Sequence, residues 1–244
     1  MHPHRPSTTR LVWIACLGGL AGFAAIAMAV AIGEAEAVDR PLLLAFRVVG
    51  DIADPLGPPW FEEMAAELTT LGGYPVLVIA GTIAFVTLWL SRQHAAALFL
   101  AASLAGGSTL SQLLKLVFAR ARPDLVEPLD RTFTASFPSG HATVGMLAWL
   151  VLAAVAARFV PRHAVRAFLV CSALVLGVVI GLSRVYLGVH WPSDVAAGWC
   201  LGIAWAAGCW LAAHYLAIGR DHPSDGRRRR PAGPGSPSGR PGRR

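Results

Sequence analysis

Six long apolar runs, separated by shorter polar connections, set the pattern of this chain. They cover residues 11–33, 74–90, 95–118, 139–159, 167–182 and 195–218. A helix needs roughly 20 apolar residues to cross the hydrocarbon core of a bilayer, and a chain in lipid must satisfy its backbone polar groups internally. The pattern therefore predicts an all-α, polytopic membrane protein, folded as a bundle of six transmembrane helices.

The longest connection, residues 34–73, is itself partly apolar. It contains an apolar patch at 42–44 and an amphipathic stretch at 60–68, and such pieces commonly lie as helices in the plane of the membrane interface. We expect interfacial helices in this loop, which either pack against the headgroups or shape a lipid entrance. The run at 11–33 is longer than the roughly 7–15 apolar residues of a signal peptide, so we interpret it as a retained first span.

The composition supports a membrane protein and distinguishes a basic C-terminal tail from the apolar remainder of the chain. Hydrophobic residues make up 55% of the chain and charged residues only 14%, whereas soluble domains carry about 25% charged residues. Eight of the 21 basic residues lie in 220–244. We therefore divide the chain into an N-terminal segment at 1–10, a helical domain at 11–218 and a disordered basic tail at 219–244.

The net charge of +7 does not indicate a nucleic-acid partner, because no aromatic stacking platform accompanies the tail arginines. We expect a solvated tail that fixes topology, with attraction to anionic headgroups as a secondary role. The cysteines lie inside apolar runs without CxxC spacing, so they predict neither a disulfide framework nor a zinc site. They are Cys16, Cys171, Cys200 and Cys209.

The distribution of Lys and Arg between alternate connections predicts the orientation. With both termini in the cytoplasm, 14 basic residues lie on the cytoplasmic side and seven on the other, as the positive-inside rule requires. Without the tail the counts are six and seven, but the outer basic residues lie mainly in polar motifs where function can override the rule. We therefore predict an integral plasma or inner membrane protein with both termini cytoplasmic.

The first of three polar clusters extends from the end of the third run into the next connection. It reads Lys115-Leu-Val-Phe-Ala-Arg-Ala-Arg122-Pro123, and Lys115 is the only lysine in the chain. A lysine among so many arginines favours a compact point charge over a planar guanidinium at this position. A lysine at a membrane boundary can also simply extend its ammonium toward water, so this cluster alone leaves both interpretations open.

The second cluster, Phe137-Pro138-Ser139-Gly140-His141, opens the fourth run. Ser139 suits a helix N-cap, and Gly140 allows a ligand to approach the backbone closely. The N-terminus of a helix favours a bound phosphate, and His141 in the first turn can point at the same anion. An ordinary capped helix is the alternative interpretation.

The third cluster begins with Ser183-Arg184 and ends with His190 and Asp194. Arg184 can bind two phosphate oxygens at once. If the turn is helical, His190 and Asp194 can meet, and a carboxylate on one ring nitrogen leaves the other free to attack. Asp194 as a plain N-cap is the alternative. Charged groups near membrane depth are functional candidates, and the three clusters together favour one site.

Together, these clusters resemble the signature of the type 2 phosphatidic acid phosphatase (PAP2) family, which is related to bacterial undecaprenyl-diphosphate phosphatases and vanadium haloperoxidases. The matching motifs are Lys115 with Arg122-Pro123, then Pro138-Ser139-Gly140-His141, then Ser183-Arg184 with His190 and Asp194. No motif position departs from the family pattern. The match covers about 80 residues, and the six-span architecture extends it over most of the chain.

The resemblance implies a lipid phosphatase that needs neither a metal nor a cofactor. It assigns His190 as the nucleophile, Asp194 as its orienting partner and His141 as the general acid. The phosphate oxygens would be bound by Lys115, Arg122, Ser139, Arg184 and the backbone N–H of Gly140. Phosphoryl transfer needs little beyond positioning and charge stabilisation, and no carboxylate cluster near the motifs suggests a magnesium site.

Two other functions use the same residues. A non-catalytic lipid-binding membrane protein on this scaffold predicts loss of the catalytic set, which is complete here. A vanadate-dependent haloperoxidase shares the anion site, but such enzymes are typically soluble and larger. The predicted orientation puts all three clusters, and so the active site, on the extracytoplasmic face. A site at the outer leaflet favours a polyprenyl diphosphate as substrate, with phosphatidic acid or phosphatidylglycerol phosphate as alternatives. Small residues along the runs suit packing within and between chains equally, which leaves the oligomeric state open.

Overall fold

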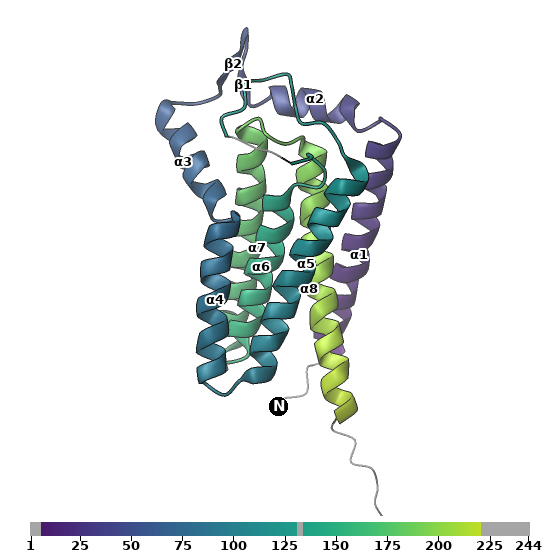
Figure 1. The fold of residues 1–244 in the computed structure, drawn as a ribbon, viewed down its shortest axis with the longest axis vertical. Coiled ribbons are helices and arrows are strands. Elements are labelled where there is room, and N and C mark those ends of the chain that lie inside the picture. Colours follow the sequence, from purple (N-terminus) through teal and green to yellow (C-terminus); the bar gives the residue numbers. More distant parts are fainter. Residues whose placement is uncertain (1–5, 131–133, 221–244) are drawn as a thin grey trace, which may run out of the picture.

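The computed structural model describes residues 6–130 and 134–220. Six long helices lie side by side as a bundle (Figure 1). They are α1 (Pro6–Ala31), α4 (Tyr74–Leu90), α5 (His94–Phe118), α6 (Gly140–Ala157), α7 (His163–Tyr186) and α8 (Pro192–Arg220). The predicted bundle of six transmembrane helices is confirmed. Most of the predicted tail, and the first half of the predicted N-terminal segment, lie outside the described residues.

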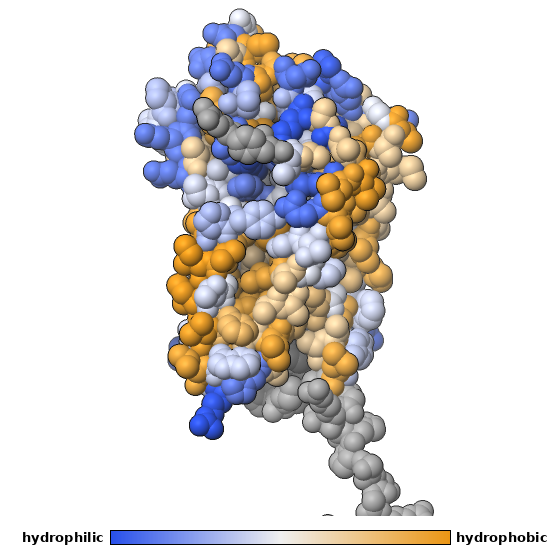
Figure 2. Space-filling view, in the orientation of Figure 1, coloured by the Kyte–Doolittle hydropathy of each residue, from blue (hydrophilic) through white to orange (hydrophobic). Residues whose placement is uncertain are grey.

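Five of these helices are long and apolar enough to cross a membrane by themselves. The sixth span is α4, which joins α3 (Pro59–Thr70) across a short break with a bend of 45°. Gly72 and Gly73 form the break. The short apolar run at 167–182 is expected to continue as a helix through Ser183 and Arg184, and α7 does so, ending at Tyr186. Figure 2 shows hydrophobic side chains over the middle and lower parts of the bundle, and hydrophilic side chains over the top end.

The first loop folds over the top end of the bundle. It contains two helices, α2 (Glu36–Leu44) and α3, where helices were predicted, and between them a hairpin of β1 (Arg47–Val48) and β2 (Asp51–Pro55). The hairpin is an addition to the all-α prediction. Its strands flank Gly50, whose φ of +95° suits a tight turn that few other residues adopt. The hairpin is too short to leave an alternating pattern in the sequence.

The helices approach one another most closely at small residues. A Cβ on Gly202 of α8 would lie 2.8 Å from the Thr143 carbonyl oxygen of α6, and a Cβ on Gly19 of α1 would lie 2.6 Å from the Cys200 carbonyl oxygen of α8. Helix α8 contacts both α1 and α6. Small residues thus allow backbone-to-backbone contact between these helices, which is how helices associate in lipid.

Candidate active site

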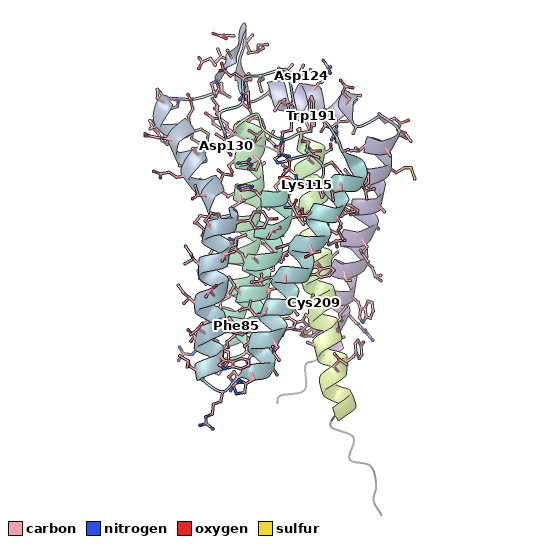
Figure 3. The ribbon with its side chains drawn as sticks, in the orientation of Figure 1. Phe85, Lys115, Asp124, Asp130, Trp191 and Cys209 are labelled. Carbon is pink, nitrogen blue, oxygen red and sulfur yellow. The ribbon has the colours of Figure 1, made fainter. Side chains whose placement is uncertain are left out.

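The three polar clusters come together at the top end of the bundle. Helices α5 and α7 end there, and α6 and α8 begin there (Figure 1). Figure 3 shows Lys115, Asp130 and Trp191 at this end, whereas Phe85 and Cys209 lie in the other half. The fold therefore gathers the predicted site residues in one region, although they are spread over about 80 positions of the sequence.

His190 lies in the short turn between α7 and α8 and is 1% exposed. Its Nε2 is 3.2 Å from the Nη1 of Arg122. The Arg122 guanidinium also donates to the Val189 carbonyl oxygen at 2.6 Å and to the Thr134 carbonyl oxygen at 2.9 Å. These bonds fix the guanidinium beside the imidazole, so an anion at Nε2 would lie against a fixed positive charge.

The other ring nitrogen of His190 faces a carboxylate and a hydroxyl. Nδ1 lies 3.5 Å from the Asp194 Oδ2 and 3.3 Å from the Ser136 Oγ, and the Ser136 hydroxyl donates to Asp194 Oδ2. The two residues meet as predicted, but 3.5 Å is longer than an ordinary hydrogen bond, and Ser136 bridges them. Sequence reasoning missed Ser136 because it lies in an irregular segment, where no periodicity marks a residue as buried.

Asp194 also completes the N-terminus of α8. Its Oδ2 accepts a hydrogen bond from the Trp191 backbone N–H at 3.0 Å, which satisfies a donor that the helix itself leaves free. Its Oδ1 accepts from Arg120 Nη1 at 2.7 Å. Asp194 is thus not the N-cap residue that the alternative interpretation expected but lies in the first turn of α8, where the contacts that satisfy the helix start also fix the carboxylate beside His190.

A second carboxylate, Asp39 of α2, is buried beside the same helix end and is 0% exposed. It accepts from the Ser193 N–H at 2.7 Å, from the Ser193 hydroxyl at 2.6 Å and from Arg120 Nη2 at 2.7 Å. Arg120 is thus shared between Asp39 and Asp194. Sequence reasoning missed Asp39 and Arg120, although Asp39 shares the buried face of α2 with Leu43, and a carboxylate on such a face needs a partner.

The start of α6 corrects one expectation. Ser139 occupies the N-cap position, but its hydroxyl makes no cap and has no hydrogen-bond partner among the described residues. Its N–H donates to the Asp194 carbonyl oxygen at 3.0 Å. Lys115 Nζ donates to the Ala135 carbonyl oxygen at 2.5 Å, and its Cε lies 3.6 Å from where a Cβ of Gly140 would be. Lys115 therefore lies against the first turn of α6, where free N–H groups favour an anion.

Arg184 of α7, the third predicted cation, is 1% exposed. Its Nη1 donates to Asp130 Oδ2 at 2.7 Å and to Thr69 Oγ1 at 3.1 Å. Its Nε is buried without a hydrogen-bond partner among the described residues. The pairing with Asp130 was not predicted, because no local pattern relates two residues 54 positions apart. A phosphate that binds Arg184 must share the guanidinium with Asp130 or replace it.

His141, in the first turn of α6, lines a pocket of about 540 Å³ beside the break between α3 and α4. Its Nε2 lies 3.7 Å from where a Cβ of Gly73 would be. Asp130, the partner of Arg184, lines the same pocket, together with Thr69 and Thr70. The sequence predicted that His141 points at the bound anion, and the structure adds an accessible space on its side of the site.

Burial sets the protonation of the two site groups that lie in connections. Burial lowers the pKa of the His190 imidazole to about 3, with Arg122 and Arg184 acting in the same direction and Asp194 against it. Burial and the nearby Arg184 likewise lower the pKa of the Arg122 guanidinium to about 10. At neutral pH His190 is therefore uncharged, with a lone pair on one ring nitrogen, and Arg122 is a cation.

The arrangement can bind an anion and present a nucleophile to it. Arg122 lies beside the neutral imidazole, Lys115 lies against the start of α6, and Arg184 is bonded to Asp130, which lines the pocket. Within residues 6–130 and 134–220, no three His, Cys, Asp or Glu side chains are grouped in a way that could hold a metal ion.

The sequence matches known proteins over much of its length. The model of the PAP2 superfamily matches residues 96–218, a range that includes every predicted site residue. A lipid A 1-phosphatase from Rhizobium etli is 33% identical over 205 residues, which are 79% of this chain and 81% of that protein. A phosphatidylglycerophosphatase B from Bacillus subtilis is 32% identical over 152 residues, which are 59% of this chain and 71% of that protein.

A solved structure shares the fold. The crystal structure of a transmembrane PAP2-type phosphatidylglycerolphosphate phosphatase from Bacillus subtilis matches with a TM-score of 0.68 and 25% identity, and covers 89% of this chain and 100% of that chain. The family model spans half of the chain, and the relatives described above are named phosphatases. On this evidence the chain belongs to the PAP2 superfamily and is an integral membrane phosphatase.

Proposed function

We propose that this enzyme removes phosphate from a lipid phosphate ester or diphosphate through a phosphohistidine intermediate on His190, without a metal. The observation that carries the proposal is the environment of the two ring nitrogens. Nε2 lies beside the Arg122 guanidinium, and Nδ1 faces Asp194 and Ser136. A neutral imidazole in this setting has one nitrogen oriented by protein contacts and the other available as a nucleophile.

The first step transfers the phosphoryl group to the enzyme. The Nε2 lone pair attacks phosphorus, the N–P bond forms, and the bond from phosphorus to the leaving oxygen breaks. His141 gives its proton to that oxygen as general acid. Lys115, Arg122 and Arg184 neutralise charge on the remaining oxygens, assisted by Ser139 and the Gly140 N–H. Positioning and charge stabilisation of this kind are most of what phosphoryl transfer needs.

The second step releases phosphate. His141, now deprotonated, takes a proton from a water molecule, whose oxygen attacks phosphorus. The N–P bond breaks and returns the electron pair to His190 Nε2. Inorganic phosphate leaves, and the site regains its starting protonation.

The substrate is a lipid, and the site faces the outer side of the membrane. Related proteins are named for the phosphatidylglycerol phosphate and lipid A that they act on, which supports a lipid phosphate as the substrate here. With both termini in the cytoplasm, the end of the bundle that carries His190 opens at the outer leaflet. Polyprenyl diphosphate, phosphatidylglycerol phosphate and phosphatidic acid are the candidate substrates at that surface.

His190→Ala tests the nucleophile directly. We expect purified wild-type protein to release phosphate from a lipid panel and the variant to release none, because no other group takes the place of Nε2. His163→Ala is the matched control, since His163 is an exposed histidine at the start of α7, at the opposite end of the bundle. Full activity in His190→Ala would overturn the assignment, as would equal losses in the two variants.

A second test concerns the metal and the transition state. We expect phosphate release to persist in excess chelator and to be blocked by vanadate, which can adopt the geometry of the transferring phosphoryl group. Loss of activity on chelation, with recovery on adding magnesium, would contradict the proposal. Halide oxidation assayed on the same samples separates this function from that of a haloperoxidase.

A further inference from the structure

The pocket beside His141 has a defined chemical character. Besides His141, its polar side chains come from Thr69 and Thr70 of α3 and from Asp130 in the connection before α6, with apolar contributions from Leu129 and Leu187. Its volume of about 540 Å³ lies within the range of small-molecule sites. The side chain of Asp130 is 40% exposed even though one of its oxygens is bonded to Arg184, so the carboxylate is accessible. Figure 3 shows Asp130 at the top end, beside α3 and α7.

The proposed reaction determines which part of the substrate would bind in this pocket, so the inference rests on the proposed function. The attacking and leaving groups lie roughly in line on opposite sides of phosphorus. His190 Nε2 attacks from one side, so the leaving oxygen and its proton donor, His141, lie on the other. Because His141 lines the pocket, the group attached to the leaving oxygen enters this space. We call it the leaving-group pocket.

The lining of the leaving-group pocket is unsuited to a second phosphate. Apart from His141, whose proton goes to the leaving oxygen, the charged lining among its described residues is one carboxylate, from Asp130, with neither Lys nor Arg. Arg184 is bonded to Asp130 but is itself almost fully buried. A diphosphate would place its second phosphate beside the carboxylate, and like charges at such distances repel. A hydroxyl group would find acceptors instead in Asp130 and in the threonine hydroxyls.

We propose that the leaving-group pocket binds a hydroxylated alcohol directly at the leaving oxygen, such as the glycerol or sugar headgroup of a lipid phosphomonoester, and that Asp130 selects against lipid diphosphates. This differs from the preference for a polyprenyl diphosphate that the position of the site at the outer leaflet suggests. Asp130 acts here as a specificity-determining residue through its charge and its hydrogen-bond acceptors.

Phosphate release from three lipids in mixed detergent micelles tests the proposal. The probes are phosphatidylglycerol phosphate, phosphatidic acid and farnesyl diphosphate. We expect kcat/KM of the wild-type enzyme to be highest for phosphatidylglycerol phosphate, whose glycerol carries a free hydroxyl, and lowest for the diphosphate, by about tenfold or more. A diphosphate hydrolysed as well as the hydroxylated monoester would overturn the proposal.

Asp130→Asn removes the charge and keeps the shape. We expect it to reduce the ratio of kcat/KM for the monoester to kcat/KM for the diphosphate by about tenfold. The control is Asp124→Asn, which removes the charge of an exposed aspartate in the same connection and should leave that ratio unchanged. The ratio cancels any general effect of freeing Arg184, since all substrates share that contact. An unchanged ratio in Asp130→Asn would contradict the role of Asp130.

Thr70→Val provides a variant that does not disturb Arg184. Thr70 is exposed, and among the described residues its hydroxyl donates only to the Glu67 carbonyl oxygen of its own helix. We expect about a fivefold loss in preference for phosphatidylglycerol phosphate over phosphatidic acid, and no such loss would contradict the pocket assignment. Phosphate release from all three lipids without discrimination overturns this inference alone, whereas release from none overturns the proposed function as well.

Discussion

Two buried regions of the bundle are held together by different forces. The glycine crossing, formed by Gly202 of α8 against Thr143 and Met146 of α6, brings backbone against backbone with no space for a Cβ. The polar end is the network of Asp39, Arg120, Ser136, His190 and Asp194, which is joined by hydrogen bonds and ion pairs. Both regions involve α8, at different distances from its start.

This difference suggests that one part of α8 contributes mainly to the stability of the bundle, whereas its start contributes mainly to the geometry of the site. At the glycine crossing, stabilisation comes from close contacts that are individually weak and not directional. At the polar end, each contact fixes a direction as well as a distance, and a buried charge that loses its partner is costly. We infer that the crossing determines how near α6 and α8 lie, while the polar end determines where the Asp194 carboxylate and the His190 ring point.

Among the changes that compare these two regions, the largest effect is expected from Asp39→Asn at the polar end. The change removes one of the two carboxylates that hold Arg120 and weakens the acceptor for the Ser193 N–H and hydroxyl. Arg120 then shifts toward Asp194, and a small misplacement of the catalytic pair lowers kcat by about 100-fold. The measurement is kcat per folded enzyme, with phosphatidylglycerol phosphate as substrate.

Asp51→Asn is the control for that change. Asp51 is an exposed carboxylate in the same loop, and its side chain accepts from the Ala53 N–H, so the same substitution there should leave kcat unaltered. Wild-type kcat in Asp39→Asn would show that α2 does not help to orient the site, and would remove the distinction drawn between the two regions.

A smaller effect, and on stability rather than on chemistry, is expected from Gly202→Ala. The added Cβ meets the Thr143 carbonyl oxygen at 2.8 Å and the Met146 Cβ at 2.9 Å, so α6 and α8 must separate. Overpacking of this kind costs about 2 kcal/mol, which thermal unfolding in detergent reports as a lower midpoint. Gly18→Ala is the matched control, because a Cβ there meets no atom within 4 Å. Equal midpoints in the two variants would contradict the role of the crossing.

The smallest effect is expected from pH, through Arg122, which lies beside His190 of the polar end. Burial lowers the pKa of Arg122 to about 10, so the guanidinium is charged below that pH and loses its charge as pH rises through it. Inhibition by orthophosphate should weaken about tenfold across this transition. His190 stays neutral throughout, because its pKa is about 3. Arg122→Gln should bind phosphate weakly at every pH, and a transition that persists in this variant would exclude Arg122 as its source.

Much of the fold could be predicted because its signals are local. A run of apolar residues identifies a span without reference to any other part of the chain, and the predicted run at 74–90 coincides with α4. Helices in the first loop were also predicted, since an amphipathic stretch is visible in its own residues. The β-hairpin was not, because two residues of β1 are too few to establish an alternating pattern.

The residues of the candidate site likewise fall into those that the sequence identified and those that it did not. The motif residues Lys115, Arg122, His141 and His190 were found because they are unusual polar residues at the ends of apolar runs. Ser136 and Arg120 lie only a few positions from these motifs, but nothing local distinguishes them from ordinary loop residues. Asp39 could have been noticed as a carboxylate on the same helix face as Leu43, but the sequence does not indicate which residue it pairs with.

The sequence by itself determined the number of spans, the ends at which polar residues gather and the set of groups available for chemistry. Only the tertiary structure decided which of them meet. The Ser193 hydroxyl and Asp39 are 154 positions apart, and the Arg184 guanidinium pairs with Asp130 beside the pocket that His141 lines. Hydropathy acts on each residue through its own transfer into lipid, whereas a hydrogen bond or ion pair requires two specific groups within about 3 Å. That distance is set by how the whole chain packs.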